Sequence, residues 1–296
     1  MVKRVPHSNY QRIGLCRLNI KKGRYFKAIE LLKKIDEKKL ERLNFILYNF
    51  CKSDLYKKSA LYNKALFYLK RANHKIGNRI EKSWILIHLV DILRRVGNYN
   101  KAEALLYDYK NNFGELYDLE AILWEIKISQ RKWDEAKSIE EKIRKKFGYF
   151  GGEKTETIEK RFKNSDRLWK IWFYERYLNF EKALEILNLI AKENKISPFE
   201  VKLKRAELLF ELGDRKKAKS IIESLLKENL SPEELIILSD FFSRNILIPE
   251  LSIKFLEKLK LKVKNQKAKE DITKKIEYLK RFKGFFKKPT NQSADF

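Results

Sequence analysis

The sequence predicts an all-α solenoid of about seven helix pairs followed by a capping helix, and three observations support this. Gly and Pro are scarce, at 10 and 5 of 296 residues, whereas strand-rich folds need many turns. Apolar residues in several segments recur at i, i+3, i+4 and i+7, the spacing of one helical face. A short pattern also repeats at steps close to 34 residues, which is typical of arrays of helix-turn-helix units.

The recurring pattern is a turn, a bulky ring, two further residues and a small residue that leads into an apolar run, and its seventh copy, which begins at Pro249, is degraded. The clearest copy is Gly97-Asn98-Tyr99-Asn100-Lys101-Ala102. The glycine ends the first helix of a pair, the ring fills the gap between the two helices, and the small residue lets the second helix approach closely. The small residues are Ala28, Ala65, Ala102, Ala136, Ala183, Ala218 and Ser252, at steps of 37, 37, 34, 47, 35 and 34.

Individual helices can be placed from local signals. The apolar stripe from Ala28 to Ile35 predicts the second helix of the first pair. Ser197-Pro198 and Ser231-Pro232, each with Glu three residues after the Ser, predict the first helices of the last two pairs. Asn265 is expected to cap a last helix. The apolar face of that capping helix would carry Ile272, Ile276, Leu279 and Phe282.

The 47-residue step between Ala136 and Ala183 indicates an insertion of about a dozen residues near Gly151-Gly152. A loop and a lengthened helix are both open for this insertion, which could act as a hinge or have no role. The rings and lysines of 285–288 would suit a membrane surface or a partner, and a frayed terminus explains them equally well. We expect N-terminal repeats in 1–147, an irregular insertion or hinge in 148–168, C-terminal repeats with the capping helix in 169–282, and a basic flexible tail in 283–296.

In these features the chain resembles the tetratricopeptide repeat (TPR) family over roughly residues 9–260. The match lies in the second half of each repeat, in the ring and the small residue described above. The resemblance implies a right-handed superhelix with a concave groove that binds peptides or partner helices. It also implies that the first helix of each pair lines this groove.

Two rows of residues, eleven and seven positions before each small residue, are the candidates for this groove. They include two acid-first pairs, Asp54–Lys58 and Asp91–Arg95, at helical i, i+4 spacing. Trp169 and Trp172 share a helical face and are hot-spot candidates for a partner helix or peptide, or else fill the joint beside the insertion. The predicted partner-binding residues are Arg17, Lys21, Asp54, Lys58, Asp91, Arg95, Trp169, Trp172 and Arg176.

The charge of the chain points to a second class of partner. The formal net charge is +27 and is concentrated near the two ends, and a charge of this size attracts polyanions such as RNA or acidic lipids. Cys16 and Cys51 have neither the spacing nor the His neighbours of a zinc site. The sequence contains no run of about 18 apolar residues, the length that a helix needs to cross a membrane. We expect a cytoplasmic protein, with peripheral attachment to the inner face of the membrane as an option.

No catalytic motif is visible in the sequence. Phosphate-binding glycine loops, a nucleophile elbow and metal-selecting carboxylate spacings are all missing. We therefore expect a non-enzymatic protein without cofactor or metal. The leading hypothesis is a scaffold or adaptor that binds a peptide or helix of a partner protein in the groove. The alternative is binding of RNA or of an anionic membrane surface, and the oligomeric state stays open.

Overall fold

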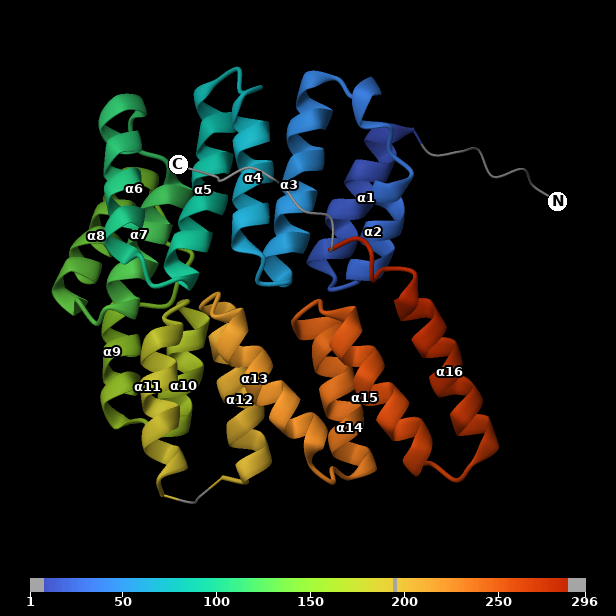
Figure 1. The fold of residues 1–296 in the computed structure, drawn as a ribbon. Coiled ribbons are helices and arrows are strands. Elements are labelled where there is room, and N and C mark those ends of the chain that lie inside the picture. The colour runs from blue at the N-terminus through green and yellow to red at the C-terminus, as the bar shows by residue number, and fades with distance from the viewer. Residues whose placement is uncertain (1–7, 194–195, 287–296) are drawn as a thin grey trace. The chain divides into compact units, whose positions relative to one another are not determined.

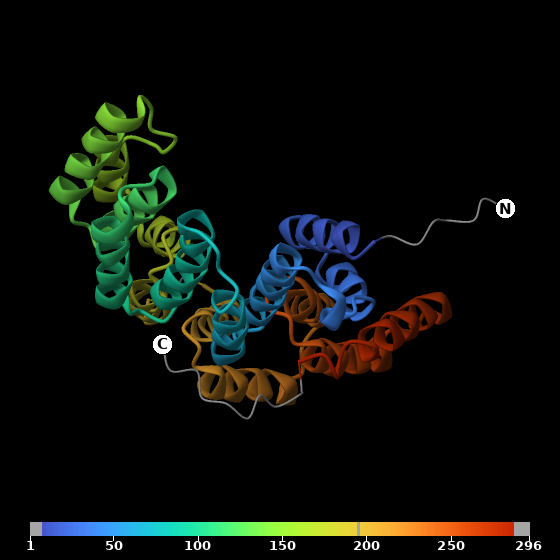
Figure 2. The same ribbon diagram turned by 90° about the horizontal axis from the view of Figure 1, so that it is seen from above.

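The computed structural model describes residues 8–193 and 196–286, and within this part of the chain helices alternate with turns and no β-strand occurs (Figure 1). The predicted all-α fold of stacked helix pairs is confirmed. Neighbours such as α3 (Arg42–Lys58) and α4 (Tyr62–Asn73) lie side by side in both views (Figures 1 and 2). Contacts group the chain into unit 1, residues 1–76 with 223–296, and unit 2, residues 77–222.

Unit 1 combines helices from both ends of the chain. Its packed pairs are α1 with α2, α3 with α4 and α14 with α15, and α16 packs beside α15. Besides α3 and α4, the elements are α1 (Asn9–Lys21), α2 (Tyr25–Lys33), the 3₁₀ turn η1 (Glu37–Lys39), α14 (Pro232–Asp240), the π-helix η2 (Phe241–Asn245), α15 (Pro249–Lys262) and α16 (Gln266–Lys280).

Unit 2 contains the central helices. Its packed pairs are α5 with α6, α7 with α8 and α10 with α11, while α9 adjoins α8 and α12 adjoins α11. A further helix, α13 (Arg215–Lys227), crosses the boundary between the units. The helices of unit 2 are α5 (Arg79–Arg95), α6 (Tyr99–Phe113), α7 (Tyr117–Ser129), α8 (Trp133–Phe147), α9 (Thr155–Asn164), α10 (Arg167–Arg176), α11 (Phe180–Ala191) and α12 (Pro198–Glu211).

The small residue of every repeat is fully buried, as predicted. Each lies in the second helix of its pair, where a larger side chain would hold the two helices apart. The predicted capping boxes at Ser197 and Ser231 are also formed, each with Pro at the start of the helix, and Asn265 caps α16. The fully buried small residues are Ala28, Ala65, Ala102, Ala136, Ala183, Ala218 and Ser252.

A left-handed residue stands five positions before the small residue in six of the seven repeats. Three are the glycines that the sequence indicates; the other three have side chains, at φ values between 51° and 59°. In five of these turns the next amide donates to the carbonyl five residues earlier, as from Asn98 to Leu93 at 2.8 Å, which is the Schellman ending of a helix. The six left-handed residues are Gly23, Ala60, Gly97, Arg131, Leu178 and Gly213.

Turns of early helix pairs meet turns of late helix pairs within each unit. In unit 2, Tyr99 Oη donates to the carbonyl oxygen of Leu178 at 2.9 Å, and Asn179 Nδ2 donates to that of Ser129 at 3.0 Å. In unit 1, Ser59 Oγ donates to the carbonyl oxygen of Leu247 at 2.9 Å. A simple repeat array, in which each repeat touches only its neighbours, has no such contacts, and the sequence did not predict them.

The expected irregular insertion, 148–168, contains helix α9. A buried network anchors its first residue: Thr155 Oγ1 donates to Glu140 Oε2 at 2.8 Å and accepts from Trp124 Nε1 at 2.9 Å. Burial alone would raise the pKa of Glu140, but hydrogen bonds from Thr155 and from Arg144 lower it below its usual range. The boundaries of the compact units lie elsewhere, at 76/77 and 222/223, and a hinge in this segment stays a prediction.

The predicted capping helix α16 buries Ile276 and Leu279, and Phe282 follows in the same apolar face. The expected flexible tail begins, in the structure, with a packed turn. Phe285 stacks on Tyr56 of α3 with ring centroids 5.7 Å apart, and Lys64 Nζ donates to the carbonyl oxygen of Phe286 at 2.8 Å. The remainder of the tail, 287–296, lies outside the described residues.

Candidate functional site

The site is built on α10, the first helix of its pair in unit 2. Asp166 caps this helix, because its Oδ1 accepts from the backbone amide of Trp169 at 2.7 Å. The ten residues that follow are rich in rings and alternate between buried and exposed positions at helical spacing. The two faces of α10 therefore differ in what they contact.

The inner face of α10 fills the joint beside the insertion. Phe173 is 1% exposed and packs on Phe162 of α9 with ring centroids 4.8 Å apart. Trp169 stacks on Phe173 at 5.6 Å and lies half-buried against the same core. Of the two predicted hot-spot tryptophans, Trp169 thus helps to fill the joint.

The outer face of α10 presents a stripe of three exposed side chains at i, i+4 and i+8: Leu168, Trp172 and Arg176. Leu168 is 55% exposed and Trp172 is 49% exposed. The Arg176 guanidinium lies 5.5 Å from the centroid of the Trp172 ring, a cation–π contact that holds both side chains in place. An exposed Trp beside an Arg is a composition that interface hot spots favour.

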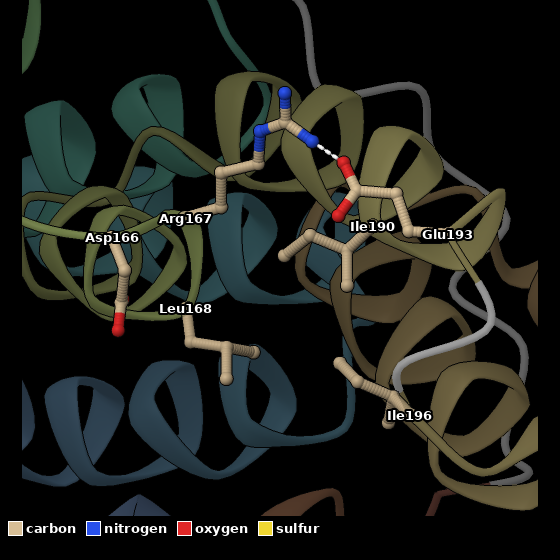
Figure 3. Close-up of a pocket in the computed structure, with 6 residues that line it drawn as sticks. All are labelled: Asp166, Arg167, Leu168, Ile190, Glu193 and Ile196. Carbon is tan, nitrogen blue, oxygen red and sulfur yellow. Dashed lines mark ion pairs between the residues drawn. The ribbon is translucent and has the colours of Figure 1, made fainter.

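A cavity of ≈ 460 Å³ opens at the beginning of α10, next to Leu168. Figure 3 shows Leu168, Ile190 and Ile196 around this space, with an ion pair between Arg167 and Glu193 at its edge. The walls are mainly apolar and the rim is charged, which is the general make-up of a site for a small ligand or for an anchoring side chain.

A charged network lies beside the stripe, between α10 and α12. Lys204 Nζ reaches Glu175 at 2.7 Å and Glu207 at 2.8 Å. Burial raises the pKa of Glu175. The neighbouring acids Glu207 and Glu211 raise it further, and Lys204 lowers it by less than the sum of these effects. Burial by itself would lower the pKa of Lys204, but the attraction and hydrogen bonds of Glu207 and Glu175 raise it. The network keeps this surface polar and presents an excess of carboxylates.

The predicted pair Asp91–Arg95 is formed on α5 of unit 2. Arg95 Nε donates to Asp91 Oδ1 at 3.3 Å, and Arg95 also pairs with Glu211 of α12. The guanidinium lies 5.8 Å from the ring centroid of Phe180. Arg95 therefore links α5, α11 and α12, and its charge is largely engaged within the protein.

The four remaining predicted residues belong to unit 1. Arg17 and Lys21 are exposed on α1, whereas Asp54 and Lys58 are partly buried on α3. Asp54 pairs with Lys57 at 3.2 Å, and Lys58 Nζ lies 5.8 Å from the ring centroid of Tyr25. The predicted residues thus fall into two groups, one in each unit, and a single groove formed by both stays a prediction.

Sequence reasoning missed Leu168, Ile190 and the Glu175–Lys204 pair. Leu168 could have been found, because it stands one helical turn before Trp172. The contribution of Ile190 could not, because it depends on how α11 packs beside α10. Among the described residues, no group of three or more His, Cys, Asp or Glu could hold a metal ion. No helix in the described ranges is long and apolar enough to cross a membrane.

Comparison with known proteins adds little to this picture. No family model and no curated protein matches the chain. Among solved structures, a tetratricopeptide repeat protein from Parabacteroides merdae ATCC 43184 is similar at 17% identity, with a TM-score of 0.35, over 92% of this chain and 98% of that chain. A likeness this distant identifies neither a family nor a partner, so the assignment of the all-α fold rests on the helix contacts described above.

Proposed function

We propose that the protein is a non-enzymatic scaffold that binds a peptide or helix of a partner protein on the outer face of α10. The observation that carries this proposal is the exposed stripe Leu168–Trp172–Arg176 beside an apolar cavity. Large apolar side chains that gather on one face in this way are typical of interaction sites.

The chemistry of this face supports a partner with one apolar anchor and one carboxylate opposite Arg176, since the carboxylates around Lys204 disfavour further acidic groups. An aliphatic or aromatic side chain of the partner would enter the cavity between Leu168 and Ile190, while Trp172 covers the partner backbone. Arg176 would face a partner carboxylate, because its guanidinium is exposed and is held over the indole ring.

Peptide display against the wild-type chain, followed by affinity measurement on the Trp172→Ala variant, tests the proposal. We expect the selected peptides to lose at least about tenfold in affinity, because a hot-spot Trp contributes 2 kcal/mol or more in typical interfaces. Tyr10→Ala is the matched control, since it removes another exposed ring, on α1 of unit 1. Unchanged affinity of Trp172→Ala, with an unchanged circular dichroism spectrum, would refute this site.

A second candidate function, binding of RNA or an anionic surface, is favoured by the distribution of charge. Unit 1 contains 36 Lys and Arg against 16 Asp and Glu, a net charge of +20, whereas unit 2 has 31 against 24, a net charge of +7. Polyanion binding would depend steeply on salt. Filter binding of a generic RNA at two salt concentrations tests it, and no retention at low salt eliminates it.

A further inference from the structure

A cavity of ≈ 270 Å³ in unit 1 lies between the turn of the first helix pair and the C-terminal helices. Its walls come from the Gly23 turn, the first residues of α2, the π-helix η2 and one face of α16. It is separate from the α10 face, which belongs to unit 2. The lining residues are Gly23, Arg24, Tyr25, Phe26, Lys27, Asp240, Ser243, Arg244, Lys275, Tyr278 and Leu279.

Positive charge predominates in this cavity. Four of its lining side chains are cationic and one, Asp240, is acidic. Lys275 Nζ forms an ion pair with Asp240 Oδ1 at 2.7 Å. Arg244 Nη2 lies farther from the same carboxylate, 4.0 Å from Asp240 Oδ2. Among the described residues, Arg24 and Lys27 have no acidic partner within ion-pair distance. The cavity thus holds cationic groups whose charge is not neutralised inside the unit.

Further positive potential comes from the surroundings of Tyr25. Lys58 Nζ lies 5.8 Å from the centroid of its ring. Helix α2 begins at this residue, and the side chain of its N-cap, Arg24, makes no capping hydrogen bond. The positive end of the α2 dipole therefore adds to the side-chain charges. Glu30, one turn further along α2, acts electrostatically on Tyr278 and offsets part of this potential.

Aromatic rings form the apolar part of the cavity. Phe26 and Tyr278 pack edge to face with ring centroids 5.9 Å apart, and Tyr25 completes the wall. These rings are only partly buried, so the cavity exposes them to solvent. An inorganic anion would form ion pairs with the cations but would leave these rings exposed to solvent.

The π-helix η2 places the remaining polar groups. Ser243 is buried and donates to the carbonyl oxygen of Asp240 at 3.1 Å, while the next residue, Arg244, is exposed at the rim. A π-turn widens the helix by one residue relative to the regular α-helical turn and is frequent at functional sites. In this chain Arg244 of η2 and Asp240, the last residue of α14, line the same cavity.

We propose that this cavity binds a phosphate monoester carried on an aromatic ring. The phosphate, with a charge of about −1.5 to −2 at neutral pH, sits among Arg24, Lys27 and Arg244. The ring lies against Tyr25 and the Phe26–Tyr278 pair. Such a group occurs on a free aryl phosphate and on a phosphotyrosine side chain, and both present the same chemistry to the cavity.

Isothermal titration calorimetry of the full chain with phenyl phosphate, inorganic phosphate and phenol tests the proposal. We expect phenyl phosphate to bind at least about tenfold more tightly than either fragment, because only it engages both the cations and the rings. No binding of phenyl phosphate at millimolar concentration overturns the proposal. Inorganic phosphate binding as tightly as phenyl phosphate overturns the role of the rings.

Two exposed cations provide the variant test. Lys27→Gln and Arg244→Gln should each weaken phenyl phosphate binding about five- to tenfold without loss of the fold, since both side chains are exposed. Lys254→Gln, an exposed lysine on α15 outside the cavity, is the matched control and should bind normally. An equal loss in Lys254→Gln would show attraction to the net charge alone and would overturn the assignment to this cavity.

A further titration distinguishes a phosphotyrosine side chain from a free aryl phosphate as the ligand. A short peptide with phosphotyrosine flanked by glycines is compared with phenyl phosphate. Tighter binding of the peptide assigns the ligand to a protein side chain, and weaker binding assigns it to a free small molecule. Trp172→Ala should bind phenyl phosphate as the wild type does, so failure of the α10 proposal and failure of this one are distinguishable.

Discussion

Units 1 and 2 share one repeat architecture but differ in their electrostatics. Ala28 of unit 1 and Ala183 of unit 2 are both fully buried, and Ala60 and Leu178 both adopt the left-handed turn conformation. Yet the net charge is +20 in unit 1 and +7 in unit 2. The repeat therefore depends on the buried small residue, with a left-handed turn and a ring in most copies, and leaves the charges free to differ.

Some acids of unit 2 are paired with buried cations. Lys127 is 3% exposed and lies between Glu103 at 2.6 Å and Glu135 at 2.8 Å. Arg94, equally buried, pairs with Glu125 at 2.8 Å. Unpaired buried charges are strongly destabilising, so these acids are required where the cations are enclosed. In unit 1 the cations around the Gly23 turn are exposed. Water can solvate them, and an anionic ligand can pair with them.

The largest expected effect compares buried rings in the two units. Phe173→Ala in unit 2 should lower the free energy of unfolding by about 3–5 kcal/mol. Phe173 contacts the rings of Trp133, Phe162, Trp169, Tyr174 and Tyr177.

Phe282→Ala is the counterpart in unit 1. This ring is equally buried but contacts only Phe26 and Tyr278 among the ring pairs of the described residues. We therefore expect a smaller loss, near the lower end of the same range. Urea unfolding followed by circular dichroism measures both variants. A larger loss in Phe282→Ala would contradict the view that the ring cluster of unit 2 is the stronger core.

Acid pH should act more strongly on unit 2. Hydrogen bonds from Lys142 and Lys146 lower the pKa of Glu115 to about 2, from an ordinary value of 4.5. Because the carboxylate is favoured in the folded state, its contribution is present above pH 4.5 and is lost as the pH falls toward 2. The contribution is on the order of 1 kcal/mol after allowance for solvent screening.

Glu115→Gln should therefore flatten the dependence of the unfolding free energy on pH between 4.5 and 2. The control in unit 1 is Glu270→Gln on α16, an exposed acid with no ion pair among the described residues. This variant should keep the slope of the wild type. Urea titrations at three pH values measure the slopes, and equal slopes in Glu115→Gln and wild type would contradict the assignment.

The smallest expected effects concern the left-handed turns. Gly23→Ala should cost about 1 kcal/mol through backbone strain alone, since an added Cβ would meet no atom within 4 Å. Ala60→Gly relieves the same strain. Glycine also loses more conformational entropy on folding than alanine, which offsets part of this gain. We therefore expect a stabilisation of up to about 0.5 kcal/mol.

Leu178→Gly, the corresponding change in unit 2, should give no gain. The Leu178 side chain packs against the core of that unit, and its removal cancels the relief of strain. Thermal unfolding of the three turn variants provides the measurement. Stabilisation by Leu178→Gly similar to that by Ala60→Gly would mean that packing at the two turns does not differ.

The thiols illustrate a limit of sequence reasoning. The sequence shows only two distant cysteines, yet Cys16 and Cys51 are both buried in unit 1. A hydrogen bond with Cys16, together with burial, raises the pKa of the Cys51 thiol well above its usual range. Their meeting depends on the packing of α1 beside α3, which the repeat period does not specify for particular side chains.

The sequence by itself determined the helix pairs, because the ring, the small residue and the capping boxes act within some 35 residues of chain. Three turns without glycine could be located only by their distance from the small residue. The tertiary structure decided which repeats meet across the sequence, as Ser59 meets Leu247 in unit 1. It also decided that Trp169 packs half-buried against the core while Trp172 is exposed. Such contacts join residues far apart in the chain, and their selection depends on the packing of whole helices, which no local pattern encodes.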